Sequence, residues 1–370
     1  MDRKRLLVPG PVEISDEVRR AGAERLPYMR TASFSALTFE VVAGLRRVVE
    51  TAGEVLLLTA SGTAAMEAAV LALFRPRDRV LVIVGGTFGR RFAEICRIHE
   101  VDCDTLDLEP GRDLDLAEFE ARVRGAAYAG VLVNAHETST GALYDIEGMG
   151  RVLRGTPALF LVDAIGTVCA DPYRMDAWGV DATVFSTQKG LALPPGMAFV
   201  ALGPRARERA LGAPRRSLYL HLADYLKDAE RGQTPYTIAV GLMLQLRERL
   251  RRLAAGGIEA EVAATRRRAL RFRKGIEGLP VEVLPQRPSN ALTALRLLTD
   301  RITAPEVVRR LDDEYGLVVA PNPPPLRDRV FRVAHLGAQT DDDVESAIRA
   351  LQGVLGRGLP HGPGGQPGGT

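Results

Sequence analysis

Short apolar runs alternate with helical patterns between residues 54 and 203. The runs predict strands at residues 54–60, 79–85, 101–107, 128–135, 158–164, 182–187 and 197–203. Most of the intervals between them have helical spacing, at residues 63–73, 89–98, 116–124 and 146–153. Near-continuous Val, Leu and Ile in the strands is typical of a mostly parallel sheet with helices on both faces. The pattern therefore predicts a large α/β domain built on a seven-stranded sheet.

The pattern changes after Gly203, where helices dominate. Long helical stretches at residues 236–253 and 259–278 precede short strands near 282–285, 291–298, 316–320 and 330–337, with helices near 305–315 and 340–355. We therefore predict a large domain over residues 21–250, a smaller α/β domain over residues 251–356, and an N-terminal segment, residues 1–20, that packs on the small domain. Residues 357–370 are rich in Gly and Pro, so we expect a disordered tail there.

Composition and charge argue against several kinds of protein. The formal net charge of the 370 residues is only +3, and the arginine clusters have helical spacing, so no nucleic-acid partner is expected. No apolar run reaches the roughly 18 residues of a membrane span, and no signal peptide is recognisable. The three cysteines, Cys96, Cys103 and Cys169, lack C-x-x-C spacing, which argues against a disulfide framework or a zinc site. These features predict a cytoplasmic protein.

Lys189 stands out because this chain uses arginine for nearly every other positive charge. Of the 49 basic residues, the lysines are Lys4, Lys189, Lys227 and Lys274. Lys189 has apolar neighbours, whereas the other three have charged or polar ones. An arginine would stay protonated, but a lysine in apolar surroundings can lose its proton and become an amine nucleophile. A lysine that snorkels from a strand end to water is the alternative.

The carboxyl ends of parallel strands are where ligands bind in such sheets, so the residues that follow each strand are candidates for a site. Ser61, Gly62 and Thr63 open a helix after the first strand, as either an anion site or an ordinary helix N-cap. Phe88 lies between two glycines after the second strand, where it covers a flat ring or serves as a helix-entry staple.

Two further strand ends carry polar residues. Residues 136–140, His-Glu-Thr-Ser-Thr, follow the strand at 128–135 and either bind a polar ligand or satisfy one another in a turn. Asp163 ends an apolar strand, where a carboxylate is costly unless it meets a cation or a donor. An Asx-turn acceptor is the other interpretation of Asp163.

Together these features match what pyridoxal 5′-phosphate (PLP) requires of a protein. The PLP aldehyde forms a Schiff base with a lysine, and its ring nitrogen needs an anion nearby in order to stay protonated. The phosphate needs N–H donors, and the ring needs an apolar or aromatic face. Lys189, Asp163, residues 61–63 and Phe88 supply these groups, so the sequence predicts PLP as the cofactor.

The chain resembles the class V aminotransferases, which are PLP enzymes of fold type I, and within them the alanine–glyoxylate and serine–pyruvate branch. The matching segments are LLVPGPVEISDEV, RTASFSAL, SGTAAMEAA, GGTFGRR, HETSTGALYDI, VDAIGT, STQKGLALPPG, GQTPYTIAV and VFRVAHLG. They occur in family order, and the resemblance covers residues 6 to about 356. It implies a homodimer with shared active sites.

The resemblance implies a role for each matching residue. Lys189 would form the Schiff base and shuttle the substrate proton, and Asp163 would pair with the pyridinium nitrogen. Phe88 would stack on the ring, and Thr138 would reach its phenolic oxygen. The residues implied to hold the phosphate are Ser61, Gly62, Thr63 and Gln188, joined by Thr237 and Thr234 of the neighbouring subunit. Arg332 would bind the substrate carboxylate with its guanidinium fork.

Four residues depart from the family pattern: Met29, Ala60, Gly190 and Ala334. Met29 and Ala334 lie in segments that line the substrate pocket in the family, so they leave the substrate less defined than the cofactor. The leading hypothesis is a ping-pong transamination between a small α-amino acid, such as alanine or serine, and an α-keto acid, such as glyoxylate or pyruvate. A PLP enzyme that catalyses β-elimination, lyase chemistry or condensation is one alternative, and a non-catalytic binding protein is another.

Overall fold

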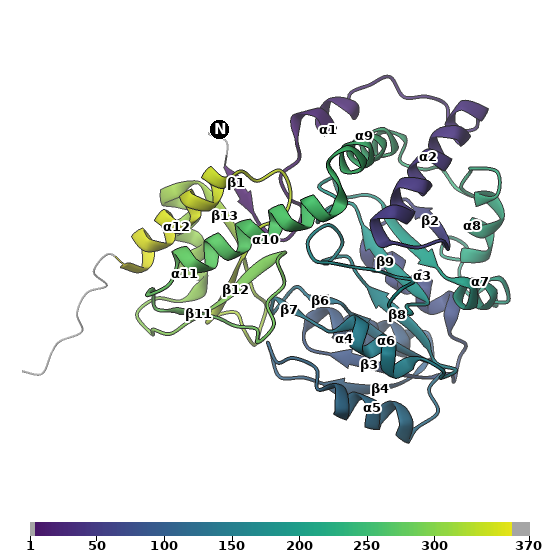
Figure 1. The fold of residues 1–370 in the computed structure, drawn as a ribbon, viewed down its shortest axis with the longest axis horizontal. Coiled ribbons are helices and arrows are strands. Elements are labelled where there is room, and N and C mark those ends of the chain that lie inside the picture. The colour runs from purple at the N-terminus through teal and green to yellow at the C-terminus, as the bar shows by residue number, and fades with distance from the viewer. Residues whose placement is uncertain (1–3, 357–370) are drawn as a thin grey trace, which may run out of the picture.

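Two β-sheets, each covered by helices, lie side by side in the molecule (Figure 1). This computed structural model describes residues 4–356, so the tail expected at residues 357–370 lies outside the described residues. Within the described range, no helix has the length and apolar character that a membrane crossing requires.

The larger sheet has seven strands, as the sequence predicts. In spatial order they are β2 (Glu54–Leu58), β10 (Ala198–Leu202), β9 (Ala182–Ser186), β8 (Leu159–Asp163), β5 (Gly130–Asn134), β3 (Arg79–Val84) and β4 (Asp102–Asp107). β10 runs antiparallel to both of its neighbours, and the pairs from β9 to β4 are parallel. The predicted α/β fold with a mostly parallel sheet is therefore confirmed.

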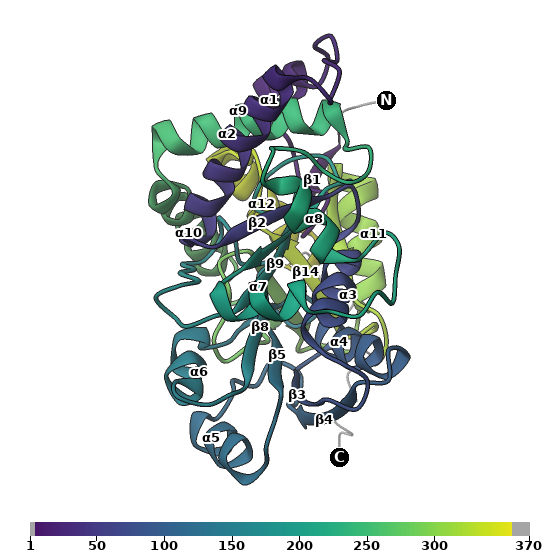
Figure 2. The same cartoon turned by 90° about the vertical axis from the view of Figure 1, so that its right-hand side faces the viewer.

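Helices cover both faces of this sheet because successive strand residues point to opposite sides. In β3, for example, Leu81 and Ile83 belong to one core cluster, whereas Val80 and Val82 belong to another. One face is covered by α2 (Ala32–Val49), α5 (Leu116–Gly125), α6 (Ile146–Leu153) and α9 (Val240–Gly256). The other is covered by α3 (Gly62–Leu73), α4 (Thr87–Ile98), α7 (Pro204–Leu211) and α8 (Leu222–Ala229). Figure 2 shows α5 and α6 on one side of the strands and α3 and α4 on the other.

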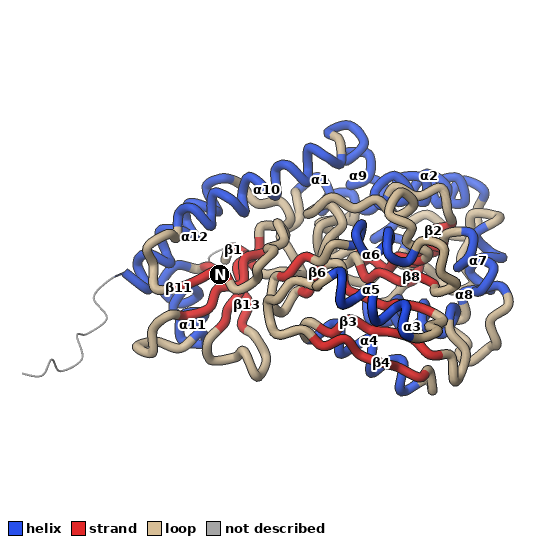
Figure 3. Tube along the Cα trace, turned by 60° about the horizontal axis from the view of Figure 1, so that its bottom comes forward, coloured by secondary structure: helices blue, strands red, loops and turns tan. Residues whose placement is uncertain are grey.

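The smaller sheet has five strands and its own core. Its order is β1 (Arg5–Leu7), β13 (Leu317–Pro321), β14 (Val330–Ala334), β12 (Leu292–Leu297) and β11 (Val281–Val283). The helices that pack on it are α10 (Ile258–Gly275), α11 (Ala304–Tyr315) and α12 (Asp341–Gly356). Figure 3 shows α10 and α12 together along one side of these strands. α9 ends at Gly256, and Gly257, whose φ is +85°, separates it from α10; the domain boundary expected after residue 250 stays a prediction.

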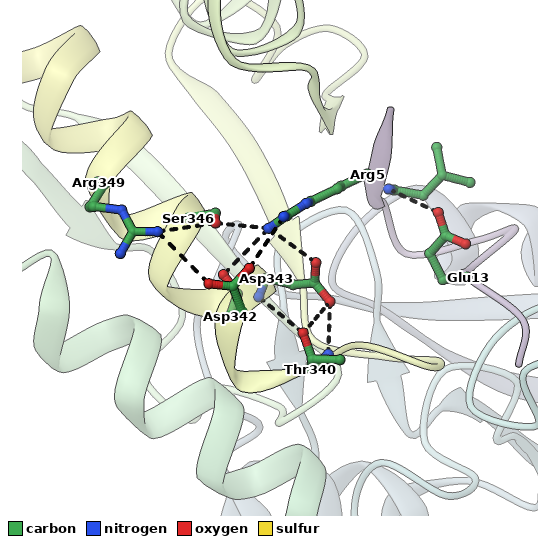
Figure 4. Close-up of polar contacts among 8 residues, drawn as sticks. Arg5, Glu13, Thr340, Asp342, Asp343, Ser346 and Arg349 are labelled. Carbon is green, nitrogen blue, oxygen red and sulfur yellow. Dashed lines mark hydrogen bonds and ion pairs between the residues drawn. The ribbon is translucent and has the colours of Figure 1, made fainter. Parts of the chain in front are cut away.

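The N-terminal segment connects the two sheets. β1 pairs in parallel with β13, and the Arg5 guanidinium lies between the Asp342 and Asp343 carboxylates at 3.2 and 3.3 Å while it donates to Ser346 at 2.8 Å (Figure 4). The chain then passes the loop that follows β9 and contains Gln188. A side chain at Gly10 would lie 3.1 Å from the Gln188 carbonyl oxygen, so only a glycine fits there without displacing that loop.

Several elements, most of them short, were not predicted from the sequence. They are β1, the helix α1 (Asp16–Ala21), α2, α7, α8, and the two-residue strands β6 (His136–Glu137) and β7 (Ala142–Leu143). β6 and β7 form a hairpin that immediately follows the carboxyl end of β5. This hairpin carries the polar residues that the sequence analysis selected after that strand.

Candidate active site

Lys189 follows β9 and is buried, with 8% of its surface exposed. Its Nζ donates a hydrogen bond to the Thr138 Oγ1 at 2.7 Å and lies 5.1 Å from the centroid of the Phe88 ring. Burial lowers the pKa of Lys189 to about 8, against the attraction of the Asp163 carboxylate, which raises it. A lysine that snorkels to water does not fit this burial, whereas an amine that loses its proton near neutral pH does.

Asp163 ends β8 beside Asn134, its register partner at the end of β5. Its carboxylate is buried and accepts hydrogen bonds from the Asn134 side-chain amide at 2.6 Å and from the Ile165 backbone N–H at 2.8 Å. Burial raises the pKa of Asp163, and these two hydrogen bonds and the Lys189 charge oppose that rise. The two hydrogen bonds therefore fix the position of the Asp163 carboxylate, which can pair with a further cation.

A cavity of about 230 Å³ lies between these groups. The structure brings eight of the predicted residues to its wall: Ser61, Gly62, Thr63, Phe88, Thr138, Asp163, Gln188 and Lys189. Gly10, Met66, Arg91, His136, Ile165 and Gly166 complete the lining. The carboxyl ends of β5, β8 and β9 and the start of α3 therefore meet at one place, as expected for a parallel sheet.

The start of α3 supports both interpretations of Ser61. Its hydroxyl accepts a hydrogen bond from the Ala64 N–H at 3.4 Å, so Ser61 is the helix N-cap. The first backbone N–H groups of a helix have no partner within the helix and face this cavity with the positive end of the helix dipole. An added Cβ at Gly62 would lie 2.5 Å from the end of the Ile165 side chain, so the glycine leaves room for Ile165 in its present position. A phosphate fits this end of the cavity.

The polar turn after β5 has two functions in the structure. The Glu137 carboxylate accepts hydrogen bonds from the Phe88 and Gly89 backbone N–H groups at 3.0 and 3.2 Å and from the Ser139 hydroxyl at 2.6 Å. Glu137 thereby caps α4, whose N-cap residue Gly86 has no side chain to do so, and it fixes the backbone at Phe88. This role was not predicted from the sequence, because Phe88, which Glu137 contacts, lies 49 residues away.

His136 leaves a polar atom without a partner at the cavity wall. Its Nδ1 lies 3.2 Å from the Gly166 carbonyl oxygen, whereas its buried Nε2 has no hydrogen-bond partner. Burial lowers the pKa of His136 to about 3, so the ring is neutral. An unpaired buried atom of this kind fits a polar ligand better than an empty pocket. Together with the phosphate end and the Phe88 ring, it shows that the cavity suits PLP.

Arg332 lies on β14 at the edge of this site. Its guanidinium donates to the Thr138 carbonyl oxygen at 3.1 Å and to the Pro321 carbonyl oxygen, and its Nε has no partner. Burial lowers the pKa of Arg332 to about 10, so it remains a cation at neutral pH. Arg91, which the sequence analysis also missed, donates to the Thr63 hydroxyl at 3.2 Å and stacks on Phe88.

Some selected residues lie away from the cavity. Thr234 donates to the Tyr236 carbonyl oxygen, Thr237 is exposed, and neither residue lines the cavity. Met29 packs on the large core, and Ala334 is fully buried in a small-domain cluster, so neither lines it. Within residues 4–356, no group of three or more His, Cys, Asp or Glu side chains is arranged to hold a metal ion.

Comparison with known proteins places the chain in a family. The model of the aminotransferase class-V family matches residues 23–320. The chain is 32% identical to the small subunit of a soluble hydrogenase of Synechococcus sp. over 96% of this chain and 93% of that protein. It is 29% identical to the L-aspartate–glyoxylate aminotransferase of Paracoccus denitrificans over 96% and 92%. The crystal structure of an alanine–glyoxylate aminotransferase from Nostoc sp. superimposes with a TM-score of 0.90 at 28% identity over 96% of each chain.

The fold and the cavity define a PLP-dependent enzyme of fold type I. The chain belongs to the class V aminotransferase family, and it is an aminotransferase that moves an amino group between an amino acid and a keto acid.

Proposed function

We propose that this aminotransferase takes a small α-amino acid, such as alanine or serine, as donor and glyoxylate or pyruvate as acceptor. The relatives named above for aspartate–glyoxylate and alanine–glyoxylate transfer support glyoxylate as an acceptor. The observation that carries the proposal is the position of the buried Lys189 amine, which lines the same cavity as Asp163. Lys189 and Arg332 also contact the same residue, because Lys189 donates to the Thr138 hydroxyl and Arg332 donates to the Thr138 carbonyl oxygen.

Each residue then has a defined task. PLP, when bound, draws electrons away from the substrate Cα and so makes its proton removable. The Lys189 amine would hold PLP through its Nζ, and as a free base it would accept the proton from the substrate Cα and hold it for return. Asp163 holds a proton on the ring nitrogen, and the Thr138 hydroxyl stays within 2.7 Å of the Lys189 Nζ.

Recognition of the substrate falls to Arg332. Its two Nη groups are held by the backbone carbonyls of Thr138 and Pro321, and Nε remains free. A guanidinium fixed in this way is preorganised to bind an α-carboxylate. Phe88, whose backbone is fixed by Glu137, covers the cofactor ring.

We also propose a homodimer in which Thr234 and Thr237 reach the phosphate site of the other subunit. Neither residue lines the cavity of its own chain, and Leu26, Tyr28 and Phe39 expose large apolar surfaces, 70% in the case of Tyr28.

Mixing the Lys189→Ala and Thr237→Asp variants tests this arrangement. Mixed dimers should regain activity, because one of their two sites is intact. Mixed samples that stay inactive although dimers form would exclude shared sites.

A spectral titration tests the reaction itself. The PLP-loaded protein is mixed with single amino acids in the absence of a keto acid, and the absorbance of the bound cofactor is followed. Transamination converts the cofactor once per site, and added glyoxylate restores the starting spectrum. Continuous release of ammonia without this conversion would instead indicate β-elimination. A cytoplasmic location remains a prediction, in keeping with three cysteines that are all free thiols.

A further inference from the structure

The cofactor cavity and the substrate arginine belong to different parts of the fold. Apart from Gly10, the residues that line the cavity lie between residues 61 and 189, in the part of the chain that forms the large sheet. Arg332 lies on β14 of the small sheet. The distance from a carboxylate bound by Arg332 to the Lys189 amine therefore depends on how the two sheets are joined. An error of about 1 Å in such a distance can slow a reaction by about a hundredfold.

Asp171 forms hydrogen bonds across the junction between the two sheets. It lies in the turns that follow β8 and is 2% exposed. Its carboxylate accepts hydrogen bonds from the Ser289 hydroxyl and from the Asn290 backbone N–H, the latter at 2.9 Å. The Asn290 side-chain amide donates in turn to the Ala170 carbonyl oxygen at 3.2 Å. Since Ser289 and Asn290 lie just before β12, these bonds fix the start of that strand relative to the large sheet.

The start of β12 in turn affects the position of Arg332. β12 pairs antiparallel with β14, and Ala294 lies opposite Arg332 in their register. The segment before β12 also bonds to the hairpin of β6 and β7, since the Ser289 N–H donates to the Gly141 carbonyl oxygen at 3.0 Å. The turn of this hairpin contains Thr138, whose carbonyl oxygen accepts from Arg332. The segment before β12 is thus one strand away from Arg332 and directly bonded to the turn that Arg332 contacts.

Opposite charges on the two sides of Ser289 hold this segment more firmly. The Arg273 guanidinium of α10 donates to the Ser289 carbonyl oxygen and, at 3.2 Å, to the Leu292 carbonyl oxygen. Its Nε donates to the Thr293 hydroxyl at 3.1 Å. Burial raises the pKa of Asp171, and its two hydrogen bonds and the attraction of Arg273 oppose that rise. Charge-assisted hydrogen bonds of this kind are strong and need close alignment, so the segment has a defined place.

We propose that Asp171 is a positioning residue of this aminotransferase: through Ser289 and Asn290 it sets where Arg332 lies relative to the Lys189 amine. Asp171 itself does not line the cofactor cavity. This inference rests on the proposed function, because that function assigns the substrate α-carboxylate to Arg332. Loss of Asp171 should therefore weaken the binding of carboxylates and leave the cofactor site as it is.

The matched experiment compares Asp171→Asn with Asp181→Asn at about pH 8, where Asp171 is ionised because its pKa is about 6. Asp181 is 9% exposed and accepts a hydrogen bond from the Phe160 N–H at 2.8 Å, at the opposite end of β8 from Asp163. It is thus a buried aspartate of the same sheet that does not contact the segment before β12.

Two quantities are measured with the PLP-loaded protein. Calorimetry gives the affinity for propionate, a carboxylate without an amino group, and absorbance gives the rate at which alanine converts the cofactor. Asp171→Asn should lower both by about tenfold to a hundredfold, the scale set by a misplacement of Arg332 of up to about 1 Å. Asp181→Asn should leave both unchanged. The affinity for PLP should stay the same in both variants, because neither aspartate lines the cavity.

Two further variants show whether the effect passes through Ser289 and Arg332. Ser289→Ala removes the hydroxyl donor and keeps the Asp171 charge, so it should weaken propionate binding in the same direction even if Asp171→Asn folds poorly. In an Arg332→Gln background, Asp171→Asn should cause no further loss, since the two residues act on the same contact. Thermal melts monitor the folding of every variant.

The outcomes separate failure of this inference from failure of the proposed function. If Asp171→Asn and Ser289→Ala leave propionate binding unchanged, weaken PLP binding as strongly, or act equally in the Arg332→Gln background, the inference is wrong and the proposed function stands. Equal losses in Asp181→Asn would mean a general loss of stability and would also refute the inference. If no amino acid converts the cofactor of wild type, the proposed function is wrong, and unchanged propionate binding in Asp171→Asn then refutes the inference as well.

Discussion

Asn134 offers a sharp test of how the site keeps Asp163 ionised. Its side-chain amide donates to the Asp163 carboxylate at 2.6 Å inside the protein, and this hydrogen bond lowers the pKa of Asp163. A hydrogen bond to a buried charged group contributes about 1.5–3 kcal/mol. Because this hydrogen bond favours the ionised form, its loss should raise the pKa of Asp163 further.

Two variants separate the electrostatic effect from a packing effect. Asn134→Leu removes the donor and keeps the number of side-chain heavy atoms, whereas Asn134→Asp keeps the shape and places a second carboxylate beside Asp163. Loss of a donor favours the protonated form of Asp163, so activity that needs the anion is lost at a higher pH. A neighbouring negative charge adds to this effect.

The assay is the pH dependence of the half-reaction with a single amino acid donor. The acidic limb should move to higher pH in Asn134→Leu and further in Asn134→Asp, while the basic limb stays in place. PLP affinity should fall about tenfold or more in Asn134→Leu, from the same loss of anion stabilisation. Unchanged acidic limbs, or a smaller shift in Asn134→Asp than in Asn134→Leu, would refute the reasoning. Thermal melts check that both variants fold.

Three other predictions follow from the same contacts. The arginine side chain in Lys189→Arg keeps the positive charge but stays protonated, so it can neither form the Schiff base nor act as a base. Mass spectrometry after borohydride treatment should find no cofactor attached at position 189, and turnover assays should find kcat lowered by about 10²-fold or more. Burial raises the pKa of Asp171 to about 6, above its unfolded value near 3.9. The contribution of Asp171 to the free energy of unfolding therefore declines as the pH rises from about 4 to about 6. In urea unfolding, the free energy of unfolding of Asp171→Asn should rise relative to that of wild type by at most about 3 kcal/mol between pH 4 and 7. An added Cβ at Gly85 would overlap the unpaired Tyr144 hydroxyl, so Gly85→Ala should cost about 1–3 kcal/mol in unfolding experiments and Tyr144→Phe should restore part of it.

The large sheet could be predicted because its signal is local. Each buried strand is a run of apolar residues, so the errors in the strands are confined to a residue or a few at the ends, whereas the covering helices α2, α7 and α8 were not predicted. β1 was not predicted, since it has three residues and pairs with β13, more than 300 positions away. The hairpin of β6 and β7 is equally short, and its polar residues gave no strand pattern.

Some residues of the candidate site could likewise be predicted from the sequence, and others could not. Lys189 and Phe88 follow predicted strands and Asp163 ends one, so the apolar pattern marks all three positions. The structure brings the three side chains to one cavity. Asn134 and Glu137 could not be assigned roles, because each acts on a residue that is distant in sequence and adjacent only in the folded sheet. An asparagine that ends one strand, level with an aspartate that ends the next, is the signal that could have revealed the first of these pairs.

The pairing of β1 with β13 has a consequence for how this protein is made and dissected. The small sheet is closed at one edge by residues from the beginning of the chain, so it is incomplete until the last hundred residues have been synthesised. A fragment that starts at α10 would leave β13 as a bare edge, a surface that recruits strands from other molecules. Fragments of the C-terminal part should therefore aggregate unless a peptide spanning β1 is supplied in trans.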